Sequence, residues 1–396
     1  MPDACGRPVA FTSMRTLLIT GPGGSGRTTV AAATAYAAAR GGVRTLLLGT
    51  DPADSLGPVL GDVDAPGLTV RRIDPDAGFR ADLAALQERA GGALDLLGAS
   101  RLAPEETSPL PGAEELAVLR ALRDAAASEE AYDLLVVDLP ATPRAVSLLA
   151  LPEELRRVLR RLLPPERQAA RALRPVLGRL AGVPMPAEWI HETAARLDLQ
   201  LAAVEALLAD RGTAVRLVAE PGPAGADALG TAVLGVALRG LRLDAVVANR
   251  VLPEDAAAGW LAGPVAQQRK VLDEWRAEHA VHPVAHLGRD PRGADDLAAL
   301  AVPAAPAATG PVEWPVDDRI QEDGVLVWRL PLPGARRDAL DLVRRGDELT
   351  VTAGPFRRVV PLPSALRRCT VDGAALREGE LRVRFRPDPE LWPRTR

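Results

Sequence analysis

The chain of 396 residues contains few of the residues that several common protein classes require. It has two cysteines, Cys5 and Cys369, which lie far apart and lack the paired spacing of a zinc, redox or soft-metalloid site. No apolar run approaches the ~18 residues of a membrane-spanning helix, and no secretory signal opens the chain. A net charge of −4 gives no excess of basic residues for binding nucleic acid. We therefore expect a cytoplasmic protein with no integral membrane segment and no nucleic-acid partner.

Lysine is almost absent, because Lys270 is the only lysine among 48 basic residues. Apolar residues make up 47% of the chain, which is enough for full hydrophobic cores, and the length favours two domains.

A phosphate-binding loop is the most informative motif. Residues 21–28 read GPGGSGRT and match the pattern G-x-x-x-x-G-K-[S/T], except that Arg27 stands at the lysine position. An apolar stretch at 16–20 precedes the loop, and an alanine-rich stretch at 29–40 follows it. This order predicts a strand, a loop and a helix N-terminus whose N–H groups hold phosphates. The alternative is a glycine-rich turn in an ordinary βαβ unit. The loop residues that we predict to bind nucleotide are Gly21, Gly23, Gly24, Ser25, Gly26, Arg27, Thr28 and Thr29.

Two aspartates lie at the carboxyl ends of buried strands predicted at 44–49 and 133–138: Asp51 shortly after the first, and Asp138 as the last residue of the second. The carboxyl ends of parallel strands form the ligand-binding edge of an open α/β sheet. Asp51 is placed to orient or activate a water for attack on a γ-phosphate, with a helix N-cap as the alternative. Asp138 is placed to hold Mg²⁺ together with Thr28, and its alternative is a strand-end turn residue.

Strands and helices alternate through residue 300, which predicts an α/β fold with a doubly wound, mostly parallel sheet. We expect a P-loop domain at 14–300 with a helical insertion at about 151–211, preceded by a flexible extension at 1–13. A proline-rich linker at 301–315 leads to a small all-β sandwich at 316–396. The strands predicted in the sandwich are 325–330, 348–353, 358–360 and 380–385.

Several motifs, taken in order, resemble the ArsA and Get-pathway ATPases, a branch of P-loop proteins with a deviant Walker A loop. Residues 50–56, TDPADSL, are similar to the family's first switch, TDPAHSL, and residues 148–152, LLALP, match the end of its second switch. Residues 247–253, VANRVLP, resemble a later strand end at which an asparagine, here Asn249, contacts adenine. Residues 330–334 and 371–385 resemble the α-crystallin-like, small-heat-shock-type domain of many bacterial ArsA-like chains. The resemblance implies ATP and Mg²⁺ as ligands, a homodimer, and a protein client in some members.

Three departures from the family pattern affect the γ-phosphate. The family loop reads Gly-Lys-Gly-Gly-Val-Gly-Lys-Thr, and its two lysines correspond to Pro22 and Arg27. Arginine keeps the charge but is planar and bulkier than lysine. Pro143 replaces the glycine of the second switch, so the N–H group at that position is lost.

We therefore expect a slow or degenerate ATPase, with Asp51 and Arg27 as its catalytic residues, that uses nucleotide to gate a conformational change or client binding. Loss of the first lysine weakens the inference of a homodimer, so a monomer remains an alternative. Two other functions remain open: a nucleotide-indifferent pseudo-ATPase, and a chaperone-type protein for hydrophobic segments. The scarcity of methionine argues against the chaperone-type function, because adaptable apolar grooves favour this residue.

Overall fold

The computed structural model describes residues 14–96, 100, 102–128, 132–162, 186–304 and 312–392. The predicted extension at 1–13, the middle of the helical insertion and about half of the predicted linker lie outside the described residues.

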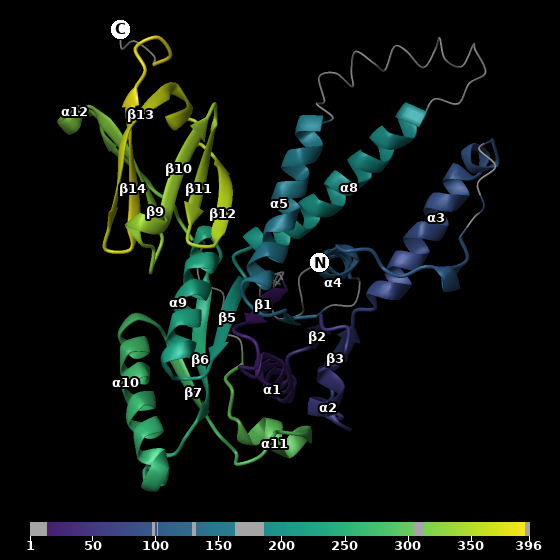
Figure 1. Cartoon of the computed structure of the whole chain (residues 1–396), viewed down its shortest axis with the longest axis vertical. Helices are drawn as coiled ribbons and strands as arrows, with labels where there is room; N and C mark the ends of the chain where they lie inside the picture. The colour runs from purple at the N-terminus through teal and green to yellow at the C-terminus, as the bar shows by residue number, and fades with distance from the viewer. Residues whose placement is uncertain are drawn as a thin grey trace, which may run out of the picture.

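A seven-stranded parallel sheet forms the centre of the first part of the chain (Figure 1). Its strands lie in the order β3-β2-β4-β1-β5-β6-β7. Their bounds are β1 (Arg15–Thr20), β2 (Thr45–Gly49), β3 (Leu68–Arg72), β4 (Leu134–Asp138), β5 (Thr213–Ala219), β6 (Leu243–Val251) and β7 (Val281–Ala285). This arrangement confirms the predicted α/β fold with a parallel sheet.

Helices cover both faces of the sheet because its strands are apolar on both sides. In β1, Leu17 and Ile19 face one core and Leu18 faces the other, and all three are buried. The first face is covered by α1 (Arg27–Arg40), α2 (Leu56–Leu60) and α11 (Gly293–Ala299). The second face is covered by α4 (Ala113–Ala126), α5 (Arg144–Leu162), α8 (Pro186–Ala209), α9 (Pro223–Leu238) and α10 (Ala262–Glu278). Helix α3 (Pro75–Leu96) packs against α4.

The two edge strands, β3 and β7, are missing from the sequence-based prediction. Strand β3 carries two arginines and is mostly exposed, so it lacks a continuous apolar run. Strand β7 contains Pro283, which is tolerated at a sheet edge because no ladder bond is needed on the outer side. Strand β6 includes Asn249.

The C-terminal part is a β-sandwich of two antiparallel sheets, with strand orders β10-β11-β12 and β13-β14-β9-β8. In β11, Leu349, Val351 and Ala353 are buried and alternate with more exposed residues, as the period-two pattern predicts. The bounds are β8 (Val316–Arg319), β9 (Val325–Pro331), β10 (Leu340–Arg345), β11 (Glu348–Ala353), β12 (Phe356–Pro361), β13 (Cys369–Arg377) and β14 (Glu380–Pro387). The all-β prediction is confirmed, although β8, β10 and β13 are absent from the predicted strands. A short helix, α12 (Ile320–Asp323), connects β8 to β9.

The sandwich packs directly on the helices of the first part. Val146 of α5 and Leu234 and Leu238 of α9 belong to the same buried cluster as the sandwich core. Gly235 of α9 allows this approach, since a methyl group there would lie 2.8 Å from the ring of Phe356. The two parts of the chain therefore share one hydrophobic core at their contact.

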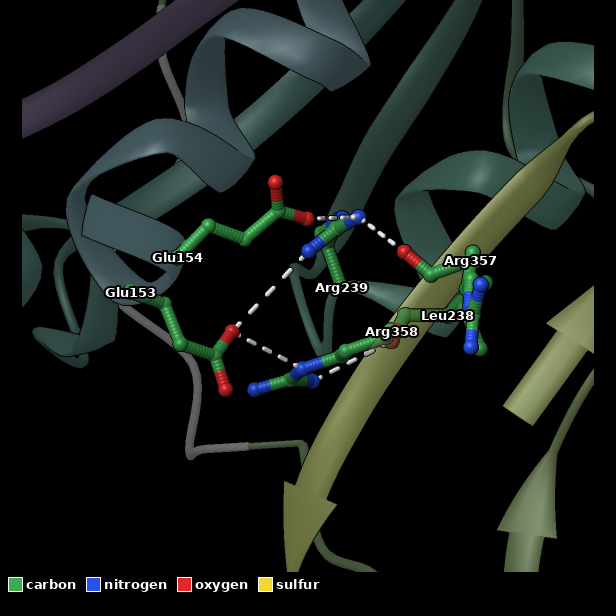
Figure 2. A network of polar contacts seen from close by, with 6 residues as sticks. All are labelled: Glu153, Glu154, Leu238, Arg239, Arg357 and Arg358. Atoms are coloured by element: carbon green, nitrogen blue, oxygen red, sulfur yellow. Dashed lines mark hydrogen bonds and ion pairs between the residues drawn. The ribbon is translucent and has the colours of Figure 1, made fainter. Parts of the chain in front are cut away.

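A buried ion network crosses the same contact, as Figure 2 shows. The side chain of Arg239 is only 7% exposed and pairs with Glu153 and Glu154 of α5. Arg358 of β12 donates a 3.1 Å hydrogen bond to Glu153, and Arg239 donates to the carbonyl oxygen of Arg357. Helix α5 is thereby tied to α9 and to the sandwich by a network in which Arg239 and Arg358 are largely buried and Glu154 is about half exposed.

The predicted linker is packed at the ends that the structure describes. Arg216 of β5 is 1% exposed and pairs with Asp244 at 2.7 Å. Its Nη1 donates to the carbonyl oxygen of Pro303 at 2.7 Å, which holds the start of the linker on the sheet. At the other end, Trp314 packs edge-on against Trp328, with ring centroids 6.0 Å apart.

Candidate nucleotide site

The predicted phosphate loop joins the end of β1 to the first turn of α1. Gly26 is the N-cap residue of α1 with a φ of 88°, and no side chain caps the turn. The first turn also has no acidic residue, so its N–H groups and the helix dipole remain suited to an anion. Gly21 has no room for a side chain, because a methyl group there would lie 2.0 Å from the carbonyl oxygen of Val218. The start of the loop is therefore packed tightly against β5.

Two polar atoms at this loop are buried without a hydrogen-bond partner among the described residues: Oγ of Ser25 and Nε of Arg27. Leaving such atoms unpaired costs free energy that a bound acceptor would restore. Both atoms lie in residues predicted to contact nucleotide, so the residues present fit a phosphate group.

A cavity of about 170 Å³ opens beside the loop and brings four predicted residues together: Arg27, Thr28, Asp51 and Asp138. Nη1 of Arg27 donates a 2.8 Å hydrogen bond to the carbonyl oxygen of Leu139. The guanidinium group is therefore held between α1 and the end of β4. These four predicted residues supply one cation, one hydroxyl and two carboxylates near the carboxyl ends of the strands.

Burial controls the electrostatics of this cavity. Asp138 is 4% exposed, and desolvation raises its pKa to about 6, against the opposing effects of a hydrogen bond with Thr28 and the charge of Arg27. Burial also lowers the pKa of Arg27, and the charges of Asp138 and Asp51 partly offset this. A buried carboxylate with a raised pKa gains from a further positive charge, which suits it to a metal ion.

Thr28 and Asp138 could hold Mg²⁺ between them, because hydroxyl and carboxylate oxygens are the ligands that this ion prefers. In the part of the chain that the structure describes, no group of three or more His, Cys, Asp or Glu residues is placed to bind a metal. The remaining ligands of Mg²⁺ would therefore come from phosphate oxygens and water.

Asp51 is not the N-cap of a helix, because Ser55 occupies that position in α2. It is exposed, and its Oδ1 accepts a 2.9 Å hydrogen bond from the N–H of Ala53, so it closes its own turn. It also lines the cavity that contains Thr28 and Asp138.

Asn249 lies on the other side of the loop. It lines a separate cavity of about 240 Å³ together with Gly26 and Thr29. Arg250 and His286 line the same cavity and are absent from the sequence-based site. The predicted nucleotide-binding residues are thus divided between two adjoining spaces.

Residues 138–143, which resemble the start of the family's second switch, pack on the phosphate loop. The N–H of Thr142 donates to the carbonyl oxygen of Gly21 at 3.0 Å, and Oγ1 of Thr20 donates to that of Pro140 at 2.7 Å. The peptide bond between Thr142 and Pro143 is cis. Neither Pro22 nor Pro143 has an N–H group to offer a phosphate.

We call the cavity lined by Arg27, Thr28, Asp51 and Asp138 the nucleotide cavity. A larger apolar groove of about 800 Å³ lies beside it. It is lined mainly by side chains from α3, α4 and α5 and from the segment before α4. Its apolar lining includes Phe79, Leu83, Leu86, Leu110, Leu116, Leu148, Leu151 and Leu155. Glu115, Arg144 and Leu148 line both this groove and the nucleotide cavity, so the two spaces adjoin. No single stretch of sequence reveals the groove, because its lining is spread over residues 79–155.

No helix within the described ranges combines the length and the apolarity needed to cross a membrane.

Both parts of the chain match models of known protein families. Residues 14–301 match the family model for the anion-transporting ATPase, and residues 323–385 match that for the HSP20-like domain found in ArsA. An uncharacterized protein of Streptomyces coelicolor is 72% identical over 391 residues, which cover 97% of this chain and 100% of the relative. A Mycobacterium tuberculosis protein is 36% identical, covering 96% of this chain and 97% of its own. An Aquifex aeolicus protein, provisionally named arsenical pump-driving ATPase 1, is 27% identical over 93% of this chain and 99% of its own.

Proposed function

We propose that this chain, which belongs to the anion-transporting ATPase family, binds ATP with Mg²⁺ at residues 21–28 and hydrolyses it slowly to ADP and phosphate. The observation that carries the proposal is the convergence of Arg27, Thr28, Asp51 and Asp138 on one cavity beside an uncapped helix N-terminus.

Each residue has a role that its position supports. The loop N–H groups and Arg27 hold the phosphates, and Thr28 and Asp138 hold Mg²⁺, which would neutralise phosphate charge. Asp51 orients the attacking water. Asn249 contacts the base in the cavity that it shares with Gly26 and Thr29.

Three features make hydrolysis slow. Pro22 supplies neither a cation nor an N–H group, and Pro143 supplies no N–H group. The guanidinium of Arg27 already donates to the carbonyl oxygen of Leu139, so part of its hydrogen-bonding capacity is engaged. Loss of one cationic group from a phosphoryl-transfer site costs roughly 10³- to 10⁵-fold in rate.

A single-turnover assay with γ-labelled ATP and Mg²⁺ tests this function by reading bound nucleotide and released phosphate together. Binding followed by slow release is the expected result. Binding without release would indicate a nucleotide-sensing pseudo-enzyme, and absence of binding would refute the site. Arg27→Ala should abolish binding, whereas Arg276→Ala should not, because Arg276 lies on α10 and pairs with Asp273 outside the cavity.

The groove supports a second function, nucleotide-gated binding of a client with an apolar segment. Its lining is dominated by leucine and phenylalanine, and it shares Glu115 and Arg144 with the nucleotide cavity. We expect the chain to suppress aggregation of an unfolded client to a different extent with and without ATP. Leu116→Gln, in the groove, should reduce this protection, whereas Val158→Gln should not, because Val158 is an exposed apolar residue that does not line the groove. Equal protection by all three proteins would contradict a client site in this groove.

The homodimer remains a proposal based on the family alone. Light scattering with and without ATP tests it, and a monomer in both conditions would remove it. The division at 14–300, 301–315 and 316–396 likewise remains our proposal for the domain boundaries.

A further inference from the structure

A second cation lines the nucleotide cavity. Among the described lining residues, Arg27 and Arg144 are the two that carry a positive charge. Arg144 is the first residue of α5 and directly follows Pro143. It also lines the apolar groove, so its side chain lies between the two spaces. The P-loop pattern does not include this position.

Two glutamates at the start of α4 hold Arg144. Its Nη2 donates to Glu114, and its Nη2 and Nε donate to Oε1 of Glu115 at 3.0 and 3.3 Å. The side chain of Arg144 is 57% exposed, and those of Glu114 and Glu115 are 45% and 25% exposed. Pairs that are this exposed to water hold weakly.

Moving Arg144 from Glu114 and Glu115 to another anion should cost little free energy. Glu114 and Glu115 lie in the first turn of α4, where the helix dipole continues to stabilise negative charge after an arginine leaves. A phosphate carries more charge than one carboxylate and can accept two guanidinium hydrogen bonds at once. Arg144 can therefore exchange its glutamate partners for a terminal phosphate in the same cavity.

We propose that Arg144 is the γ-phosphate sensor of this chain, which supplies the positive charge that Pro22 cannot supply and is held away from it by Glu114 and Glu115. This inference rests on the proposed ATP site. When Arg144 leaves Glu115, the wall shared by the cavity and the groove changes. Because Leu148, Leu151 and Leu155 of the same helix line the groove, ATP would alter the groove through α5.

Calorimetric titration of the full chain with ATP and with ADP, both with Mg²⁺, tests the sensor. We expect Arg144→Gln to weaken ATP binding by about 3- to 10-fold, because a charge-assisted hydrogen bond at a half-exposed site is lost. ADP binding should change by less than about two-fold, because the missing contact is to the third phosphate. Arg144→Lys keeps the charge and should keep most of the preference for ATP.

The glutamates provide a readout of opposite sign. Replacing both, Glu114→Gln with Glu115→Gln, releases Arg144 and should strengthen ATP binding while leaving ADP binding nearly unchanged. A merely structural ion pair would weaken binding of both nucleotides whichever partner is removed. Arg120→Gln is the matched control, since Arg120 also lies on α4 and pairs with Asp82 without lining the nucleotide cavity.

A fluorescent apolar dye, anilinonaphthalene sulfonate, reports the groove. ATP should change its fluorescence with the full chain but not with Arg144→Gln, and thermal unfolding should confirm that the variants fold. The sensor would be overturned if Arg144→Gln bound both nucleotides, and responded in the dye assay, as the unsubstituted chain does. That result would leave the ATP site intact. Glutamate variants that weaken ATP binding would also overturn it. A full chain that binds neither nucleotide would overturn the proposed function, and the sensor with it.

Discussion

Nδ2 of Asn249 donates a 2.8 Å hydrogen bond to the carbonyl oxygen of Ser25, and so joins strand β6 to the phosphate loop. Both residues are buried. The bond fixes the loop between the cavity that holds Arg27 and the cavity that holds Thr29. A nucleotide that spans the two spaces would meet a loop that is already positioned.

Gly26→Ala should disrupt this relationship. A methyl group at Gly26 would lie 2.2 Å from Nδ2 of Asn249, and the φ of 88° strains any side chain. We expect the free energy of unfolding to fall by about 1 to 3 kcal/mol, and ATP affinity measured by calorimetry to fall by at least about ten-fold. Gly263→Ala on α10 is the control, because a methyl group there meets no atom within 4 Å and the residue lies outside the phosphate loop. Equal effects of the two changes would contradict this account of the loop.

Asp138→Asn should change how stability depends on pH. The pKa of Asp138 is raised to about 6 in the folded chain, so the folded state binds the proton more tightly than the unfolded state. Asp138 therefore lowers stability more at pH 7.5 than at pH 5. The stabilising effect of Asp138→Asn, measured by urea unfolding without nucleotide, should be larger at pH 7.5 by about 1 to 2 kcal/mol. A gain that is the same at both pH values would show that burial does not raise this pKa.

Arg27→Lys should restore part of the lost rate. Lysine places a compact charge at the phosphates and lacks the second nitrogen that now donates to the carbonyl oxygen of Leu139. We expect phosphate release in a single-turnover assay to rise by about ten-fold or more, with binding retained. Arg40→Lys, at the other end of α1, should leave the rate unchanged. A lower rate for Arg27→Lys would indicate that the planar guanidinium is itself adapted to the site.

Removing both carboxylates at the domain contact should be strongly destabilising. Glu153→Gln with Glu154→Gln would leave Arg239, at 7% exposure, without a counter-charge among the described residues. A buried charge without a partner costs about 3 to 5 kcal/mol, and denaturant unfolding should show a loss of that order. Glu322→Gln, which removes an exposed partner of Arg319, should cost less than about 1 kcal/mol. A small loss for the double variant would mean that water reaches Arg239.

Contiguous patterns account for what the sequence predicts. Strand β1, the glycine spacing and the start of α1 follow one another without interruption, and Asp138 ends an unbroken apolar strand. The edge strands β3 and β7 are missed because one sheet neighbour is enough to keep them in place, so arginine and Pro283 are tolerated there. Strand β13 is missed because Gly373, at its bulge, interrupts the alternation.

The features that the sequence does not predict depend on contacts between residues far apart in the chain. The pairing of Arg144 with Glu115 joins the starts of two helices 29 residues apart in sequence, and the groove collects side chains from three helices. Neither the ion pair nor the groove produces a periodic pattern or a fixed spacing in the sequence from which it could be predicted. The alanine-rich pattern of α1 likewise predicts a helix but not that Arg216 of β5 reaches Thr34 on its buried side.

Val146 of α5 and Leu234 and Leu238 of α9 depend on the C-terminal sandwich for their burial. A chain that ended before residue 312 would expose these apolar side chains to water, and the exposed patch would favour aggregation. The fold changes between α11 and β8, but the buried cluster continues across this change. Exchanging the sandwich for another module would expose Leu234 and Leu238 of α9 unless those residues changed as well.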